Sequence, residues 1–476
     1  MKPLRITLLG LAWCAAATAA TEGTPGHSVA ADESWGTAPA AARAYVSEAL
    51  AGNLALQVRT LDLETARARL AAARAALQPR VDLIARLSVA DGGRTTDVPT
   101  GDLLNPVYQT LNDYLRSQGQ PATFPRIPNV SIPFLREHEQ ETKLRLTQPV
   151  YRPEITRGVR ARRASAESEE ASLAAFRREL RFSVLSAYYT WLQTDAAVGI
   201  LDSSLVVTSE ALRVNRALAE NGQATEDRVL RAESDELAVR QQQAEVVRDR
   251  NSARAYFNFL LNRPLDTPLI RTDETELRAV ARPLLDRPLP TGLTAARREE
   301  LTALTAAVAA ASASESASAA RSRPTIDLAV EGGIQGENYR TGHGSNFVQA
   351  SLVAQLNLWD GKERRSDTLR ASLARQQLEL QLEETRRRLD LQVQQAMDDF
   401  AATTIAMQAA ERRRLAAVRA FELVSQRERE GLVNQLTFLD ARAELTRAEL
   451  NRIISGQRLF TAAAAIDRVT ALSPLP

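Results

Sequence analysis

Residues 348–358 read Val-Gln-Ala-Ser-Leu-Val-Ala-Gln-Leu-Asn-Leu, with apolar side chains at every second position. This alternation has the two-residue period of a β-strand and puts Leu352 and Leu356 on an apolar face. Its length suits the roughly 9–11 residues that a tilted strand needs to cross a bilayer. Trp359 follows, where aromatic residues gather at a lipid boundary. The stretch therefore predicts a membrane strand over 347–359 with these two leucines toward lipid.

Three further stretches, 80–90, 141–151 and 325–332, alternate in the same way over shorter lengths. Taken singly, such patterns also fit a soluble sandwich with one solvated face. Helical flanks on every strand, and the duplication described next, favour the membrane interpretation. The further residues expected to face lipid are Val81, Leu83, Leu87, Leu144 and Leu146, with Tyr151 as a second boundary aromatic.

The four strands belong to two copies of one pattern: two strands, a long helix, a glycine turn and a second long helix. The copies span residues 79–264 and 324–472, and each supplies two strands. A membrane sheet must close on itself to satisfy its backbone, and the smallest single-chain barrels use about 8 strands. Three chains would supply about 12 strands, so the sequence predicts a homotrimer that shares one barrel in a lipid membrane.

Helical periodicity takes over after each strand pair. Apolar residues recur at steps of three and four from Leu173 to Trp191 and from Leu378 to Phe400, as narrow stripes on polar helices. A helix without internal proline over 154–220 would reach about 100 Å. Gly222 and Gly431 each follow a charged run and are expected to end one helix and begin its return. The sequence predicts helical hairpins over 154–262 and 361–470.

The remaining segments complete the organisation of the chain. Residues 91–136 are rich in proline, glycine and asparagine, and we expect a long extracellular loop there. Proline-rich residues 265–290 are expected to link the two copies, and 291–323 to form a helix. An N-terminal segment with a helix is expected over 21–78.

Residues 1–20 have the pattern of a secretory signal peptide. Two basic residues precede an apolar run that ends in small residues, and the run is too short for a membrane span. Cys14, the only cysteine, lies in this segment. Lipid attachment at Cys14 is the alternative to simple cleavage, although the bulky Trp13 before it departs from a lipoprotein signal.

Catalytic and cofactor-binding patterns are absent from the sequence. His27, His138 and His343 stand at no metal-ligand spacing, and no glycine-rich stretch has the context of a phosphate loop. The 60 basic and 58 acidic residues give a net charge of +2, spread along the helices without a nucleic-acid-binding patch. We therefore expect a non-enzymatic protein with no cofactor, no metal and no nucleic-acid partner.

Four short stretches of the sequence resemble those of a known protein family. They are residues 144–151 and 356–361 at the passages from strand to helix, 260–265 at the end of the first hairpin, and 431–442 after the second turn. In this order, over nearly the whole mature chain, the sequence resembles the TolC family of outer-membrane efflux proteins. The family implies a mainly helical chain whose trimer forms a 12-stranded β-barrel in the outer membrane of a Gram-negative bacterium, continued by a helical barrel across the periplasm.

The resemblance also implies partners and sites. It implies a passive exit duct for efflux or type I secretion, opened by a periplasmic adaptor and an inner-membrane transporter of the RND or ABC type. Asp440 matches an acidic position that narrows the periplasmic tip in the family, whereas Thr437 departs from a second acidic position. Gly431-Leu432 resembles the adaptor-contacting tip, while Gly222 in the first copy is followed by glutamine.

One rival interpretation stays open at this point. The helices also fit a periplasmic coiled-coil scaffold without a pore, although their spacing lacks strict heptads. Such a scaffold would be soluble without detergent and would tolerate charges at Leu352 and Leu356.

Overall fold

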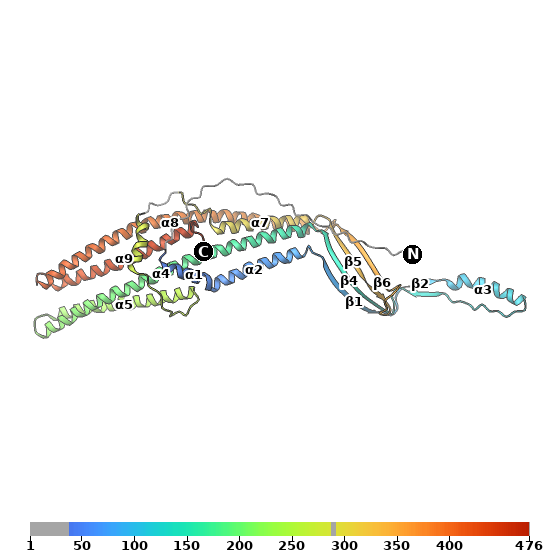
Figure 1. The fold of residues 1–476 in the computed structure, drawn as a ribbon, viewed down its shortest axis with the longest axis horizontal. Coiled ribbons are helices and arrows are strands. Elements are labelled where there is room, and N and C mark those ends of the chain that lie inside the picture. The colour runs from blue at the N-terminus through green and yellow to red at the C-terminus, as the bar shows by residue number, and fades with distance from the viewer. Residues whose placement is uncertain (1–37, 287–291, 476) are drawn as a thin grey trace.

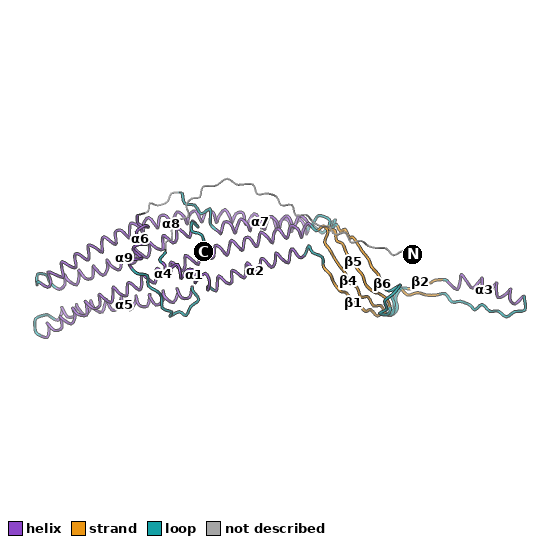
Figure 2. The backbone as a smooth tube through the Cα atoms, in the orientation of Figure 1, coloured by secondary structure: helices purple, strands orange, loops and turns teal. Residues whose placement is uncertain are grey.

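The computed structural model describes residues 38–286 and 292–475, so the expected signal peptide with Cys14 lies outside the described residues. The molecule is elongated, with long helices at one end, a sheet beyond them and a slender extension at the other end (Figure 1). Figure 2 shows the same division by secondary structure, with the strands between the bundled helices and the extension.

Two helical hairpins form most of the bundle. Helix α4 (Pro153–Glu220) has 68 residues and returns as α5 (Glu226–Leu260); helix α8 (Glu363–Arg429) has 67 and returns as α9 (Gln435–Thr470). At about 1.5 Å per residue, α4 and α8 each span about 100 Å. Among the described residues, no helix has both the length and the apolar character required to cross a membrane.

Shorter helices brace these hairpins. Helices α1 (Ala40–Gly52) and α2 (Leu54–Ala75) pack on α4, and α7 (Glu299–Ala320) packs between α4 and α8. Helix α6 (Glu274–Asp286) occupies much of the segment expected as a linker. Its apolar residues at steps of three and four explain why it folds against the bundle: Leu277, Ala281 and Leu284.

The core lies where the short helices meet the hairpins. One cluster is aromatic: Tyr45 of α1 meets Phe257 of α5 edge-on, with ring centres 5.0 Å apart, and Tyr188 of α4 lies against both. A second cluster joins α8 to α9 through Phe400 and Leu459, which are almost fully buried. Burying such side chains contributes about 1.5–3 kcal/mol each, so the narrow stripes hold the long helices together.

The sheet is antiparallel in the order β1-β4-β5-β6, from strands β1 (Arg80–Val89), β4 (His138–Tyr151), β5 (Thr325–Gly336) and β6 (Asn346–Gln355). Strand β6 ends four residues before the expected end at Trp359. Its partner β5 begins at Thr325, which pairs with Gln355, so residues 356–359 have no strand beside them in this chain. Leu356 and Trp359 therefore lie in the connection to α8.

The expected extracellular loop is an ordered extension. A two-stranded ribbon of β2 (Thr95–Val98) and β3 (Val130–Pro133) leads to helix α3 (Thr100–Ser117), and an extended segment returns beside the helix. Figure 1 shows this extension running on beyond the sheet, away from the helical bundle. The sheet therefore lies between the helical bundle and the outer extension.

Candidate functional site

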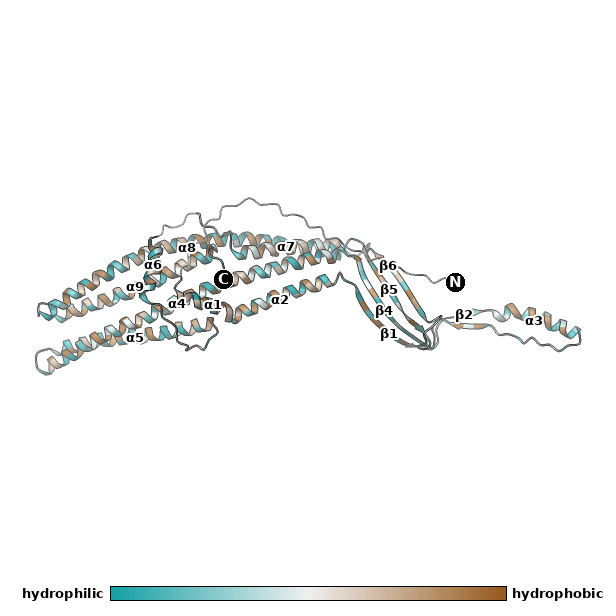
Figure 3. Cartoon of the chain, in the orientation of Figure 1, coloured by the Kyte–Doolittle hydropathy of each residue, from teal (hydrophilic) through white to brown (hydrophobic). Residues whose placement is uncertain are grey.

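One face of the four-stranded sheet is apolar and exposed. The strand register aligns Leu83 with Leu144, and Leu328 with Leu352, and residues directly opposite in antiparallel strands share a face. Leu83, Leu144 and Leu352 are 71%, 55% and 69% exposed in the single chain. Brown apolar residues alternate with teal hydrophilic ones along these strands (Figure 3). The same face holds the other apolar residues of the strand prediction: Val81, Leu87 and Leu146.

Tyr151 joins this face through an irregularity in β4. Pro149 pairs with Asp327 and Tyr151 with Ile326, so Val150 is an extra residue in the ladder. Because the side-chain period of a strand is two, one extra residue moves Tyr151 to the apolar face that Ile326 shares with Leu328. The ring lies at the end of the sheet next to the helices, where an aromatic girdle would meet the lipid boundary.

The opposite face carries a network of ion pairs. The Lys143 ammonium lies 2.7 Å from the Glu141 carboxylate and 2.9 Å from that of Glu331, which also accepts a hydrogen bond from Arg145. Arg86 of β1 extends the network to Glu141 at 3.2 Å. Charged groups in hydrocarbon would be very costly, so this face suits water. The sheet can therefore separate lipid on one side from an aqueous space on the other.

Both hairpin tips end in the same local structure. Gly222 and Gly431 have φ of 69° and 73°, in the left-handed region that favours glycine. The next residues, Gln223 and Leu432, donate their N–H groups back to carbonyls five residues earlier, both at 2.8 Å. These are Schellman motifs, which end a helix sharply. The two tips lie at the same end of the molecule (Figure 1).

The predicted tip residues are accessible in the single chain. Leu432 is 69% exposed directly after the second turn. Thr437 donates both its N–H (2.9 Å) and its hydroxyl (2.8 Å) to the Asn434 side chain, which caps the first turn of α9. Asp440, one turn further along α9, is exposed, and its carboxylate has no hydrogen-bond or ion-pair partner among the described residues. Thr437 thus has a structural role, while the Asp440 carboxylate remains free.

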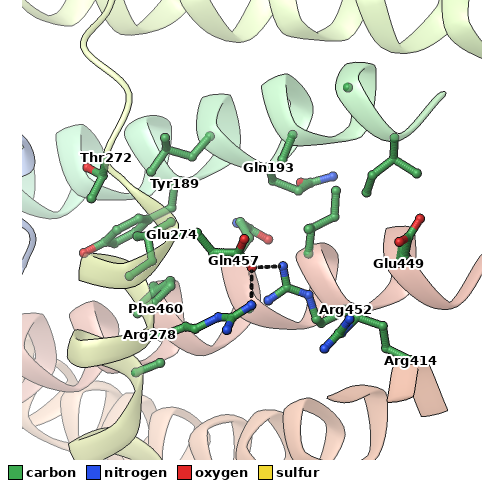
Figure 4. A pocket seen from close by; sticks show the side chains of 18 of the residues that line it. Tyr189, Gln193, Thr272, Glu274, Arg278, Arg414, Glu449, Arg452, Gln457 and Phe460 are labelled. Carbon is green, nitrogen blue, oxygen red and sulfur yellow. Dashed lines mark hydrogen bonds and ion pairs between the residues drawn. The ribbon is translucent and has the colours of Figure 1, made fainter. Parts of the chain in front are cut away.

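A cavity of about 600 Å³ lies between α4, α6, α8 and α9, and the sequence patterns did not indicate it. One carboxylate oxygen of Glu274 on α6 accepts hydrogen bonds from Arg452 of α9 at 2.6 Å and Arg278 of α6 at 3.0 Å (Figure 4). The Arg452 guanidinium also lies 3.9 Å from the Glu411 carboxylate of α8. The hydrogen bond between Glu274 and Arg452 therefore links α6, which lies between the two sequence repeats, to the second hairpin.

The arginines set the protonation of these acids. Burial opposes the charged form of Glu274, but hydrogen bonds and charge from Arg278 and Arg452 lower its pKa. The hydrogen bond from Arg414 lowers the pKa of Glu411, and the charge of Arg452 adds to this effect. Both carboxylates are therefore ionised at neutral pH. Within the described residues, no cluster of His, Cys, Asp or Glu could hold a metal ion.

Comparison with known proteins gives a consistent result. A family model described as outer membrane efflux protein matches residues 45–263 and 292–471. The outer membrane channel CmeC of Campylobacter jejuni is 13% identical, with a TM-score of 0.74, covering 91% of this chain and 86% of that chain. No curated protein matches the sequence significantly.

Two further solved structures have the same fold. The outer membrane protein VceC of Vibrio cholerae is 16% identical, with a TM-score of 0.70, covering 91% of this chain and 96% of that one. The MtrE outer membrane channel of Neisseria gonorrhoeae, in its open state, is 18% identical, with a TM-score of 0.72, covering 94% and 93%. At these identities the likeness shows the fold, and it confirms the expected fold class.

Proposed function

Because the chain belongs to the outer membrane efflux protein family, we propose that three copies of it form one exit duct across the outer membrane and the periplasm. Family membership confirms the resemblance drawn from the sequence and favours the channel over the scaffold without a pore. The channel conducts passively, and its energy comes from partner proteins.

The sheet carries this proposal. It has one apolar face and one charged face, and strands β1 and β6 each have a side that pairs with no strand among the described residues. Unpaired backbone groups are not tolerated in lipid, so both edges require partners. Pairing β6 of one chain with β1 of the next, three times over, closes a barrel of about 12 strands. Its apolar face contacts lipid and its ion-pair network lines the lumen.

The helices extend the duct away from the membrane. Helix α4 follows β4 directly and α8 follows β6 after a short connection, and the tips of both hairpins lie farthest from the sheet. We assign these tips to the periplasmic end, where an adaptor protein and an inner-membrane transporter of the RND or ABC type would engage. Exposed Leu432 beside Gly431 offers an apolar contact for the adaptor, and Gly222 shapes the equivalent turn.

Asp440 is assigned to the aperture at this end. Three copies around a threefold axis would gather three free carboxylates, which favour cations and disfavour anions. Thr437 adds no charge to this ring, because a threonine hydroxyl does not ionise; here it donates a hydrogen bond to Asn434. The ring is therefore weaker than one with acids at both positions.

The protein mass of the detergent-extracted chain tests the proposal directly. Light scattering with the detergent mass subtracted is expected to give three times the mass of one chain. Conductance in planar bilayers should then appear with the threefold species. A monomer or dimer that stays soluble without detergent would overturn the channel and return the hairpins to the scaffold interpretation.

A further inference from the structure

Helix α3 in the outer extension carries an exposed apolar seam. Leu104, Val107, Leu111 and Tyr114 follow one another at steps of three, four and three residues. They are 42%, 54%, 40% and 63% exposed, and we call these four residues the α3 seam. This spacing is the a/d pattern of a coiled coil, and Leu103, which is 69% exposed, lies beside the seam on the same side of the helix.

Another side of α3 is already occupied by the chain itself. Asn105 and Asn112 each form a pair of hydrogen bonds with the backbone of the returning segment, at Ile127 (both 2.8 Å) and at Phe124 (2.8 and 3.0 Å). The rings of Tyr108 and Phe124 lie 5.2 Å apart on the same side. These contacts fix the rotation of the helix, so the α3 seam faces outward in one defined direction.

The charges on α3 argue against a lipid surface as the occupant. Helices that lie on membranes carry lysine and arginine on their polar face. In α3, Asp113 pairs with Arg116 at 2.9 Å, and Asp102 accepts a hydrogen bond from Asn129. The helix has no lysine, and its two aspartates against one arginine leave it with a net negative charge. Anionic headgroups would be repelled.

In the proposed trimer, the position of α3 would place three identical seams at the outer mouth of the barrel. The extension leaves the sheet between β1 and β4 and runs on along the length of the molecule (Figure 1). In a trimer around one barrel, three copies of α3 would stand side by side above the outer mouth, related by rotation and therefore parallel. An isolated helix of 18 residues pairs weakly, but tethering raises its effective concentration to about the millimolar range.

We propose that the α3 seams of three chains pack together as a short parallel three-helix bundle over the outer mouth of the shared barrel. This contact rests on the proposed trimer. Leu104 and Leu111 occupy one core position and Val107 and Tyr114 the other, so each chain contributes about two heptads of seam. The bundle joins the three chains at the end of the duct opposite the periplasmic tips.

Site-directed cross-linking of the full chain in outer membranes tests this contact. Leu111→Cys places a thiol in the seam, and Gln109→Cys places one at an exposed position on the other side of the same helix, about 200° away. Oxidation should cross-link the first variant into dimers about tenfold more than the second, because only seam positions meet across a coiled coil. The unmodified chain, treated identically, gives the background from Cys14.

A second variant distinguishes packing of the α3 seams from random collisions between neighbouring extensions. Adding Leu104→Asp to Leu111→Cys puts a carboxylate in the bundle core one heptad away and should lower cross-linking about threefold or more. Light scattering of each variant reports the trimer independently of α3. A threefold mass with equal cross-linking at positions 111 and 109 would overturn the α3 bundle and leave the duct intact. Loss of the threefold mass in the unmodified chain would overturn the duct itself.

Discussion

The Lys143 ammonium on β4 lies 2.9 Å from the Glu331 carboxylate on β5, across the central strand pair of the sheet. Glu331 also accepts a hydrogen bond from Arg145, so one carboxylate serves two cations on the proposed lumen face. Loss of the Glu331 carboxylate would therefore leave both Lys143 and Arg145 less neutralised.

Glu331→Gln is expected to make the duct less selective for cations. Three copies would lose three carboxylates and leave Lys143 and Arg145 less neutralised, so the K⁺/Cl⁻ permeability ratio should fall about twofold or more. Reversal potentials of single channels in a KCl gradient measure the ratio. Glu337→Gln, in the turn beyond β5, is the matched control and should leave it unchanged. An equal ratio for both variants would remove Glu331 from the lumen.

Leu352→Arg is expected to prevent assembly in the membrane. The side chain would project from the apolar face, where an arginine near the bilayer midplane costs about 2–4 kcal/mol in each chain. Ser351→Arg, one residue earlier on the charged face, is the control and should assemble. The amount of trimer recovered from the outer-membrane fraction measures assembly. Normal assembly of Leu352→Arg, or failure of Ser351→Arg alone, would contradict the assignment of the two faces.

Asp440→Asn is expected to weaken the cation preference at the periplasmic aperture. The exposed carboxylate has no partner among the described residues, so neutralising it should leave the fold unchanged and remove charge from the pore. Single-channel selectivity should shift toward anions, whereas Asp390→Asn, an exposed position on α8, should have no effect. An unchanged selectivity would place Asp440 outside the pore.

Arg178→Ala is expected to destabilise the helical bundle. The guanidinium is 5% exposed, bonds both carboxylate oxygens of Glu299 at the start of α7 and donates to the Ser473 carbonyl at 3.1 Å. Removing it leaves the partly buried Glu299 carboxylate unpaired, which costs at most about 3–5 kcal/mol. Urea unfolding in detergent, followed by helical circular dichroism, measures the loss. Arg177→Ala, exposed next to it, should change stability by less than about 0.5 kcal/mol.

Acid is expected to loosen the contacts that α6 and α8 make with α9 through Glu274, Glu411 and Arg452. The folded state lowers the pKa of Glu411 and of Glu274, so their contribution to stability is present above the unfolded pKa of about 4.3 and is lost as pH falls through the folded values. The thermal midpoint should therefore drop between pH 5 and pH 3. Glu411→Gln should show a smaller drop than the unmodified chain; an identical drop would exclude Glu411 as a source of the acid sensitivity.

Strand positions and hairpin turns could be read from the sequence because local rules govern them. Alternation about Leu352 predicts a strand with one lipid face, and Gly431 after a charged run predicts a helix end. The end of β6 could not be read in this way. Leu356 continues the alternation, yet the strand stops at Gln355 because its partner strand begins at Thr325.

Helix α6 is a second feature that the sequence prediction missed. Prolines suggested a linker over 265–290, but the spacing of Leu277, Ala281 and Leu284 would have indicated a helix with one apolar side. The cavity beneath it depends on which helices approach one another. Glu274 and Arg452 are separated by 178 positions in the chain and meet at 2.6 Å. No local pattern encodes that distance.

The sequence by itself determined the repeat, the two faces of the strands in the four-stranded sheet and the turns between long helices, because each depends on side chains a few residues apart. Only the tertiary structure decided which charged residues meet, where β6 ends and which side of α3 is left exposed. Those features arise between segments distant in the chain, where strand register and helix packing bring side chains together.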